Sequence, residues 1–193
     1  MSHAIRISCV LVLTLSCVMA KGVMPDSDTG STRIAAWKEY LDHPSRTNGE
    51  RLYGLLPYDR TRFTLSNSAS FETIYGSVWS LEPLVLKQKR TAVRIAFKLF
   101  SICDADFCES LDQIVGALIR INPEMFLEEL SNHRTLIPHL RGLVANLGDD
   151  FVDQESKRTQ EMKARIACLK SVRSTSLRGL RDECIAALES RLR

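Results

Sequence analysis

Glycine and proline are scarce in this chain, which holds nine and six of them among 193 residues. Long runs of Val, Ile and Thr are absent as well, and both shortages argue against a sheet of short strands joined by frequent turns. Hydrophobic residues make up 45% of the chain, which is enough to bury a core, and the length fits one domain. We therefore expect a single all-α domain.

The motifs of common catalytic and nucleotide-binding sites are also missing. The chain has no P-loop and no Gly-x-Gly-x-x-Gly segment, and residues 76–79 (GSVW) lack the Gly-x-Ser-x-Gly spacing. His133 and His139 are six positions apart, with no HExxH motif or neighbouring Cys to make a zinc site. We interpret both as ordinary loop and surface histidines, and we predict no catalytic residue, no metal and no cofactor.

The first twenty residues have the pattern of a secretory signal peptide. Arg6 gives the positive region, residues 7–15 the apolar stretch and residues 18–20 a small-residue cleavage site. The apolar stretch is too short for a membrane-spanning helix. A lipoprotein signal ending at Cys17 is the alternative, although such signals prefer Leu at the position where this chain has Thr14.

This signal divides the chain into three segments and sets the expected location. Residues 1–20 are removed, residues 21–31 form a flexible polar lead-in, and residues 32–193 fold as the all-helical domain. We expect the mature protein to be periplasmic or secreted from a bacterium, with no integral membrane segment. The lack of an Asn-x-Ser/Thr sequon agrees with a bacterial origin.

Helix signals are clearest between residues 90 and 130. Apolar residues recur every three or four positions in 91–100 and again in 107–118, which is the spacing of one buried helix face. Asp104 or Asp106 can cap the second of these helices, and Asn122-Pro123 is a strong helix start. Across the chain the same signals predict about seven to nine helices, in hairpins that begin near residues 88, 123 and 156.

Two segments of the predicted hairpins echo each other. Residues 93–97 (VRIAF) and 180–184 (LRDEC) each open with an apolar residue followed by Arg. With hairpin intervals of roughly 33–35 residues, the chain over about residues 88–193 resembles HEAT or armadillo-like helical repeats. That resemblance implies stacked antiparallel helical hairpins in a curved α-array, and such arrays usually bind proteins. An irregular helical bundle would give much the same pattern.

Export changes the interpretation of the six cysteines, because two of them leave with residues 1–20. Cys103, Cys108, Cys168 and Cys184 remain, an even number that favours disulfides in an oxidising compartment. Cys103 and Cys108 flank one inter-helix turn, while Cys168 and Cys184 lie about equally far from the last turn of the chain. We therefore expect the pairs Cys103–Cys108 and Cys168–Cys184, with free buried thiols as the alternative.

Charge is distributed unevenly along the chain. Residues 104–155 hold 3 basic and 11 acidic side chains, a net charge of −8, whereas residues 157–193 hold 10 basic and 4 acidic ones, a net charge of +6. In a stack of helices these regions are neighbours with opposite fields, which steer a partner to the surface, neutralise each other or are simply solvated. We expect no nucleic-acid partner, because the basic region lacks interleaved aromatic residues and the protein is exported.

Together these features favour an exported, non-enzymatic helical protein that binds a protein partner in the cell envelope. Immunity or inhibitor proteins and scaffolding factors are examples of this class. Arg94, Glu128, His133 and Arg181 are the candidate partner-binding residues. The alternative, from another class, is an envelope hydrolase in which Glu128 or Glu50 acts as a general acid or base in a cleft.

Overall fold

The computed structural model describes residues 26–58, 68–137, 139–148 and 151–192. Within these ranges all regular structure is helical and no strand is present, which confirms the all-α prediction. No helix in this described part of the chain is both long and apolar enough to cross a membrane. The signal peptide predicted at residues 1–20 and the lipoprotein alternative at Cys17 lie outside the described residues and stay predictions.

The described residues divide into more helices than expected, because one-turn helices and 3-10 turns interrupt the longer ones. In chain order the helices are α1 (Asp26–Asp42), α2 (Arg46–Leu55), α3 (Ser68–Gly76), α4 (Glu82–Leu86), α5 (Arg90–Leu99), α6 (Ala105–Gly116), α7 (Leu118–Ile121), α8 (Pro123–His133), α9 (Leu140–Ala145), α10 (Glu155–Ser171) and α11 (Arg178–Glu189). The 3-10 turn η3 (Val78–Leu81) lies between α3 and α4, and η4 (Arg134–Leu136) lies between α8 and α9.

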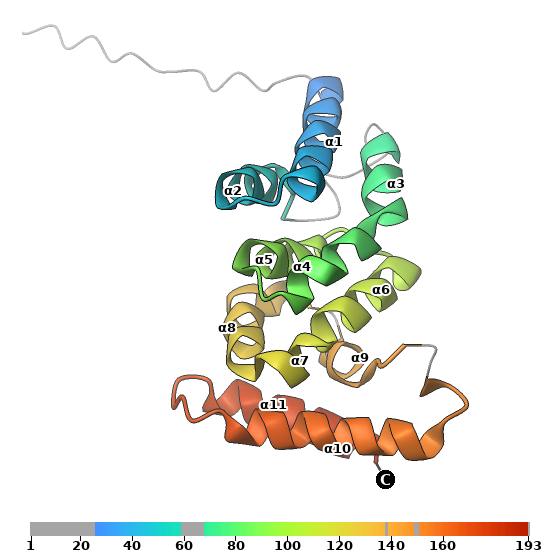
Figure 1. The fold of residues 1–193 in the computed structure, drawn as a ribbon, viewed down its shortest axis with the longest axis vertical. Helices are drawn as coiled ribbons and strands as arrows, with labels where there is room; N and C mark the ends of the chain where they lie inside the picture. Colours follow the sequence, from blue (N-terminus) through green and yellow to red (C-terminus); the bar gives the residue numbers. More distant parts are fainter. Residues whose placement is uncertain (1–25, 59–67, 138, 149–150, 193) are drawn as a thin grey trace, which may run out of the picture.

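The helices are stacked in layers along the long axis of the molecule (Figure 1). α1 and α2 form one end, α10 and α11 form the other, and α4 to α9 lie between them. α5, α8 and α10 begin at Arg90, Pro123 and Glu155, close to the three predicted hairpin starts. The stacked arrangement agrees with the predicted fold class, and the specific resemblance to HEAT or armadillo repeats stays a prediction.

Side-chain caps fix two of these helix starts. The Asn122 side chain accepts a hydrogen bond of 3.0 Å from the Met125 N–H, and Pro123 occupies the first helical position. The Asp104 carboxylate likewise accepts a hydrogen bond of 3.2 Å from the Phe107 N–H at the start of α6. Each cap satisfies an N–H group that the helix itself leaves unpaired. Both predicted starts are confirmed.

The first helix extends further toward the N-terminus than the sequence suggests. α1 begins at Asp26, so residues 26–31 are helical and the predicted boundary after residue 31 is corrected. The helix continues through Gly30 because one glycine destabilises a helix interior by only about 1 kcal/mol. The remainder of the predicted lead-in, residues 21–25, lies outside the described residues.

α5 is the central helix of the stack. It contacts α2, α4, α6 and α8, and its side chains from Ala92 to Phe100 are buried with the exception of Arg94. Phe97 packs against Phe126 of α8 with ring centroids 6.0 Å apart. Full burial of such a side chain contributes roughly 1.5–3 kcal/mol. The apolar stripe read from the sequence therefore holds the layers on both sides of α5 together.

The cysteines divide into one disulfide and two thiols. Cys103 and Cys108 are bonded, as predicted, and their Cα atoms lie 5.1 Å apart across the turn that leads into α6. The predicted pair Cys168–Cys184 is wrong, because both of these cysteines are free. Cys184 on α11 is fully buried, whereas half-buried Cys168 lies about a third of a turn away from the buried face of α10. The two sulfur atoms therefore face different surroundings.

Candidate functional site

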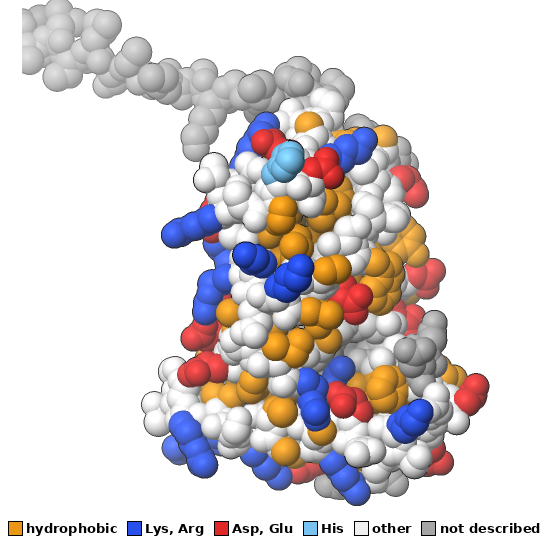
Figure 2. All heavy atoms as spheres, in the orientation of Figure 1, with side chains coloured by type: hydrophobic (Ala, Val, Ile, Leu, Met, Phe, Trp, Pro, Cys, Tyr) orange, Lys and Arg blue, Asp and Glu red, His pale blue; other side chains and the backbone are white. Residues whose placement is uncertain are grey.

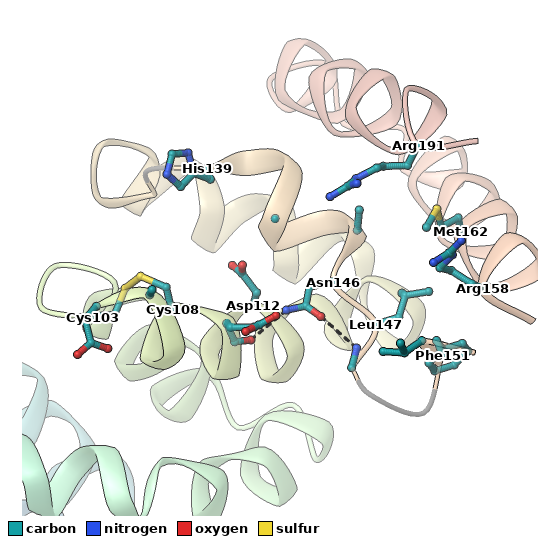
Figure 3. A pocket seen from close by; sticks show the side chains of 17 residues that line it. Cys103, Cys108, Asp112, His139, Asn146, Leu147, Phe151, Arg158, Met162 and Arg191 are labelled. Carbon is teal, nitrogen blue, oxygen red and sulfur yellow. Dashed lines mark hydrogen bonds between the residues drawn. A yellow bond between two sulfur atoms is a disulfide. The ribbon is translucent and has the colours of Figure 1, made fainter. Parts of the chain in front are cut away.

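A cavity of about 870 Å³ opens between α6, α9 and the start of α10 (Figure 3). Residues 145–148 and 151–152 border one side, and the Cys103–Cys108 disulfide lies at the end where α6 begins. This volume is within the range of roughly 300–1,000 Å³ that ligand pockets occupy. We call this space the larger cavity.

α6 supplies an acidic wall to the larger cavity. Asp104, Glu109 and Asp112 all line it, and Asp112 points into the space that α9 borders. A Cβ atom at Gly142 of α9 would lie 2.8 Å from Asp112 Oδ2, so glycine allows the close approach of helix and carboxyl group here. No hydrogen bond from a described residue reaches the Asp112 carboxyl group. Its pKa is shifted by burial and by the nearby Glu109 carboxylate.

The protonation state of Asp112 is unusual for an aspartate. Burial, and to a smaller extent the Glu109 carboxylate, raises the pKa of Asp112 from 3.8 to about 7. Below that pH the group is a neutral carboxylic acid with one O–H donor. A half-buried acid with a pKa near 7 inside a cavity is a recognised mark of a functional site.

The opposite wall of the larger cavity is basic. Arg158 of α10 and Arg191, which follows α11, both point into the cavity from the side facing Asp112 (Figure 3). Within the described ranges, neither guanidinium group has an acidic partner. Among the described residues, the cavity therefore presents two arginines without an acidic partner on one side and carboxyl groups on the other.

A smaller cavity of about 510 Å³ adjoins the larger one. The two share Leu147, Gly148 and Phe151 as lining residues, so they adjoin at this stretch, and we call the two adjoining cavities together the groove. Trp79 and Ile121 line the smaller cavity and are 46% and 42% exposed. The exposed apolar side chains Trp79 and Ile121 thus lie in the smaller cavity beside charged residues such as Arg120, and Asp112 lies in the larger one.

Lys and Arg side chains are numerous at the end of the molecule that α10 and α11 form (Figure 2). Within the described ranges, the uneven charge of the sequence is not neutralised by pairing between its two regions. Among the described residues, no acidic side chain of residues 104–155 forms an ion pair with a basic side chain of residues 157–193. The ion pairs that do join the two regions use basic side chains of residues 104–155 and acidic side chains of residues 157–193. They are Arg120–Glu161 at 3.8 Å and Arg134–Glu183 at 2.7 Å. For the described residues these contacts argue against mutual neutralisation, and they leave a surface that steers a partner or one that is simply solvated.

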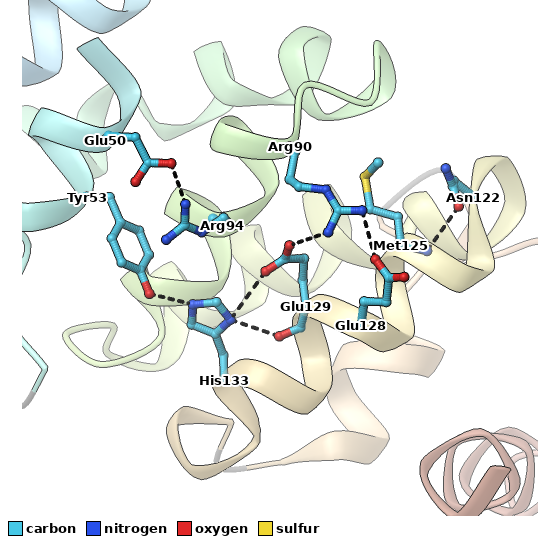
Figure 4. Close-up of polar contacts among 9 residues, drawn as sticks. All are labelled: Glu50, Tyr53, Arg90, Arg94, Asn122, Met125, Glu128, Glu129 and His133. Carbon is cyan, nitrogen blue, oxygen red and sulfur yellow. Dashed lines mark hydrogen bonds and ion pairs between the residues drawn. The ribbon is translucent and has the colours of Figure 1, made fainter. Parts of the chain in front are cut away.

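A second cluster of charged side chains joins α2, α5 and α8 (Figure 4). Arg94 of α5 pairs with Glu50 of α2. Arg90, one turn earlier on α5, pairs with Glu128 at 2.8 Å and with buried Glu129 at 3.0 Å on α8. The two exposed pairs, Arg94–Glu50 and Arg90–Glu128, contribute on the order of 0–1 kcal/mol each. Together with the Arg90–Glu129 pair they orient the three helices.

His133 lies at the centre of this second cluster and corrects the prediction of a loop or surface histidine. It is 4% exposed, because it follows Phe126 and Leu130 at helical spacing on the buried face of α8. Its Nδ1–H donates a hydrogen bond of 2.8 Å to the Glu129 carbonyl oxygen, and its Nε2 accepts one of 2.9 Å from the Tyr53 hydroxyl group. This pattern assigns the neutral ring with the proton on Nδ1. Burial lowers the pKa of His133 and keeps the ring uncharged.

The four residues predicted to bind a partner are therefore only partly brought together. Arg94, Glu128 and His133 share the second cluster, where His133 is buried and the other two reach the surface. Arg181 lies elsewhere, on α11, with its guanidinium group donating to Asp182 and to the Val172 carbonyl oxygen. None of these four side chains lines the groove.

The two carboxylates predicted for a hydrolase also lie outside the groove. Glu50 and Glu128 are engaged by Arg94 and Arg90, with side-chain exposures of 42% and 40%. Each is directed toward its own arginine, from α2 and from α8, and neither lines the groove (Figure 4). The geometry expected of a pair of catalytic acids is therefore not found at these positions.

Sequence reasoning missed the residues that do line the larger cavity. Asp112 follows Glu109 on the polar side of α6, a pattern that any solvated helix face shows. Only the packing of α9 against α6 turns that side into a cavity wall. Arg158 and Arg191 are separated by more than thirty residues, and their convergence depends on the way α10 and α11 pack.

Comparison with known proteins finds no matching family model, no matching curated protein and no matching solved structure. The function of this chain is therefore inferred from its own groove, charges and contacts.

Proposed function

We propose that this protein binds a protein partner in the bacterial cell envelope, through the groove formed by the two adjoining cavities. Large apolar side chains in the groove carry the proposal. Among the described residues, Tyr58, Trp79, Leu86, Ile121 and Val152 are the exposed large hydrophobic side chains. Trp79, Ile121 and Val152 line the groove. Exposed apolar side chains gathered in one depression are typical of a protein-binding surface, and Trp is enriched at such surfaces.

The charges of the groove support the same function. Apolar contact gives affinity, whereas unpaired charges at the rim raise the rate of encounter and favour partners of complementary charge. Arg158 and Arg191 on one side and Glu109 on the other supply such charges. An immunity, inhibitor or scaffold-like role fits a surface of this kind, in which the protein acts by occupying its partner.

The proposed location follows from two independent features. The signal-peptide pattern of residues 1–20 directs export. The Cys103–Cys108 disulfide suits an oxidising compartment, because cytosolic reductants keep such pairs reduced. The layers of paired helices also agree with the HEAT-like array that we propose for residues 88–193, a type of fold that usually presents a binding surface.

A carboxylate-dependent hydrolase is the second candidate, and one observation favours it. Asp112 has a pKa of about 7 and shares the larger cavity with His139. A general acid or base works best with a pKa near the working pH. Replacement of Asp112 by Asn would then lower turnover of an envelope substrate by about a hundredfold or more, and unchanged turnover would remove this candidate.

Site-specific photocrosslinking in the native cells tests the proposed binding function. A photoreactive phenylalanine analogue in place of Ile121 places the probe in the groove, and the same analogue in place of Leu86 gives a matched control outside it. We expect one discrete protein adduct from position 121 and none from position 86. Trp79→Ala should remove that adduct without changing the circular dichroism of the purified protein. Equal adducts at both positions, or none at position 121, would contradict the proposal.

A further inference from the structure

We infer that the larger cavity receives an acidic side chain of the bound protein segment, held between Arg158, Arg191 and Asp112. This inference rests on the proposed binding function and names the chemistry that the partner must carry. The ligand is the side-chain carboxylate of an Asp or Glu residue of the partner, because the larger cavity adjoins the smaller one at Leu147, Gly148 and Phe151 and one bound segment can contact both.

The two arginines provide the first part of the argument. Arg158 and Arg191 come from separate elements and both line the larger cavity, as Figure 3 shows. Arg158 is half-buried, so its charge has lost part of its hydration without gaining an acidic partner from the described residues. A carboxylate between two guanidinium groups would form charge-assisted hydrogen bonds, which are roughly twice as strong as neutral ones.

Asp112 provides the second part, from the opposite wall. As a neutral acid it donates its O–H to an incoming carboxylate, whereas as an anion it repels that carboxylate. Glu109 shares its helix and favours the neutral form, because a second negative charge nearby opposes ionisation of Asp112. The negative charge of Glu109 by itself opposes the binding of an anion. By keeping Asp112 protonated, however, Glu109 also preserves the O–H group that donates to that anion.

The remaining charged groups around Asp112 are compatible with this arrangement. They are Asp104 and Glu109 on α6, His139 at the start of α9, Arg158 on α10 and Arg191 after α11. The Asp104 carboxylate is engaged in capping its own helix through the Phe107 N–H. His139 is exposed. Among the described residues, the charge on the side facing α10 is therefore positive.

The opposite assignment, a basic side chain, fits the cavity less well. A Lys or Arg residue of the partner would find Glu109 and an ionised Asp112 on α6. It would also face Arg158 and Arg191, which have no acidic partner among the described residues to offset a like charge. The apolar side chains of Met162, Leu147 and Phe151 can pack against the methylene groups of a Glu side chain.

Amide NMR titration of the isotope-labelled protein tests the inference directly. The probe is N-acetyl-glutamate α-amide, and its neutral isostere N-acetyl-glutamine α-amide is the matched control. We expect the glutamate probe alone to shift amides that border the larger cavity. Its affinity should fall about tenfold from pH 6 to pH 8, because about one tenth of Asp112 stays protonated one pH unit above a pKa of about 7.

Three variants identify the groups responsible. Asp112→Asn keeps a neutral donor, so affinity at pH 8 should match affinity at pH 6. Arg158→Gln combined with Arg191→Gln should abolish the shifts at both pH values. Arg141→Gln removes an exposed arginine of α9 that does not line the cavity, and should change nothing.

Two results would overturn the inference: equal binding of the glutamate and glutamine probes, or full binding by the double arginine variant. Either result leaves the photocrosslink from position 121 as a separate measure of partner binding. Loss of that crosslink with intact probe binding would instead contradict the proposed function alone.

Discussion

The buried guanidinium group of Arg165 on α10 donates a hydrogen bond of 2.9 Å to the carbonyl oxygen of Val144 in the last turn of α9. The same Nη1 atom reaches the Asn146 carbonyl oxygen at 3.2 Å. Carbonyl groups at the end of a helix have no partner within it, so Arg165 takes the place of a C-terminal cap. Through this contact α10 holds the segment that separates the two cavities of the groove.

Replacement of Arg165 by Met should destabilise the protein by about 2–4 kcal/mol, because two buried carbonyl groups lose their donor. Urea unfolding followed by circular dichroism measures the effect. Arg158→Met, on the same helix, removes an arginine with no acidic partner among the described residues and should change the free energy of unfolding by less than about 0.5 kcal/mol. Similar losses of stability for the two variants would show that the hydrogen bond between Arg165 and Val144 does not stabilise the protein.

Gly116 packs at the same junction and leads to the second prediction. A Cβ atom there would lie 2.8 Å from the Leu143 carbonyl oxygen and 2.9 Å from Arg165 Nη1. Because a backbone atom of α9 cannot move aside cheaply, Gly116→Ala should lower stability by about 1–3 kcal/mol. Gly179 of α11 has nothing within 4 Å of a Cβ atom, so Gly179→Ala should instead raise stability by about 0.5–1 kcal/mol. Thermal unfolding of both variants gives two shifts of opposite sign if the packing is as described.

Asp112 should make the protein less stable as the pH rises. The pKa of Asp112 is about 7 in the folded chain and 3.8 for an ordinary aspartate, so between these values the folded state holds the proton more tightly. The contribution of Asp112 to the free energy of unfolding is fully present below about pH 3.8 and is lost as the pH rises through about 7. Asp112→Asn should therefore gain stability over the wild type on going from pH 5 to pH 8, by about 1–2 kcal/mol after allowance for solvent screening. A difference that does not change with pH would contradict the raised pKa.

His133 should have the opposite dependence. Burial lowers the pKa of His133 below 6.5, so on acidification the unfolded chain takes up a proton before the folded chain does. Stability is therefore unaffected by this group above about pH 6.5 and falls as the pH drops below that value. His133→Gln places a neutral amide group at the position, which can donate and accept hydrogen bonds but cannot titrate in this range. Urea unfolding between pH 7.5 and pH 5 should show a steeper loss for the wild type than for the variant, and parallel curves would argue against the buried neutral ring.

Local signals in the sequence were sufficient for much of the fold. The caps at Asp104 and Asn122 act within one helical turn, so a few adjacent residues determine them. The burial of α5 follows from its apolar periodicity, and the Cys103–Cys108 bond joins residues close in the chain. These features need no knowledge of how the helices pack.

Features that depend on packing were beyond the sequence. The pair Cys168–Cys184 looked symmetric about a turn, but the rotation of each helix about its own axis directs only Cys184 into the core. Asp112, Arg158 and Arg191 belong to three elements, and nothing in their spacing predicts that they border one cavity. His133 is an intermediate case, since its spacing from Phe126 on α8 contained the signal for burial.

The buried thiol of Cys184 gives this protein an internal reporter. Burial, with a smaller contribution from Glu183, raises the pKa of Cys184 to about 12, and reagents such as iodoacetamide attack the thiolate form. Labelling of Cys184 therefore requires α11 to detach, while half-buried Cys168 should react much sooner. Mass spectrometry of timed alkylation should find these two rates well apart. The slower rate would report how often the layer formed by α10 and α11 opens spontaneously, without any dye or engineered tag.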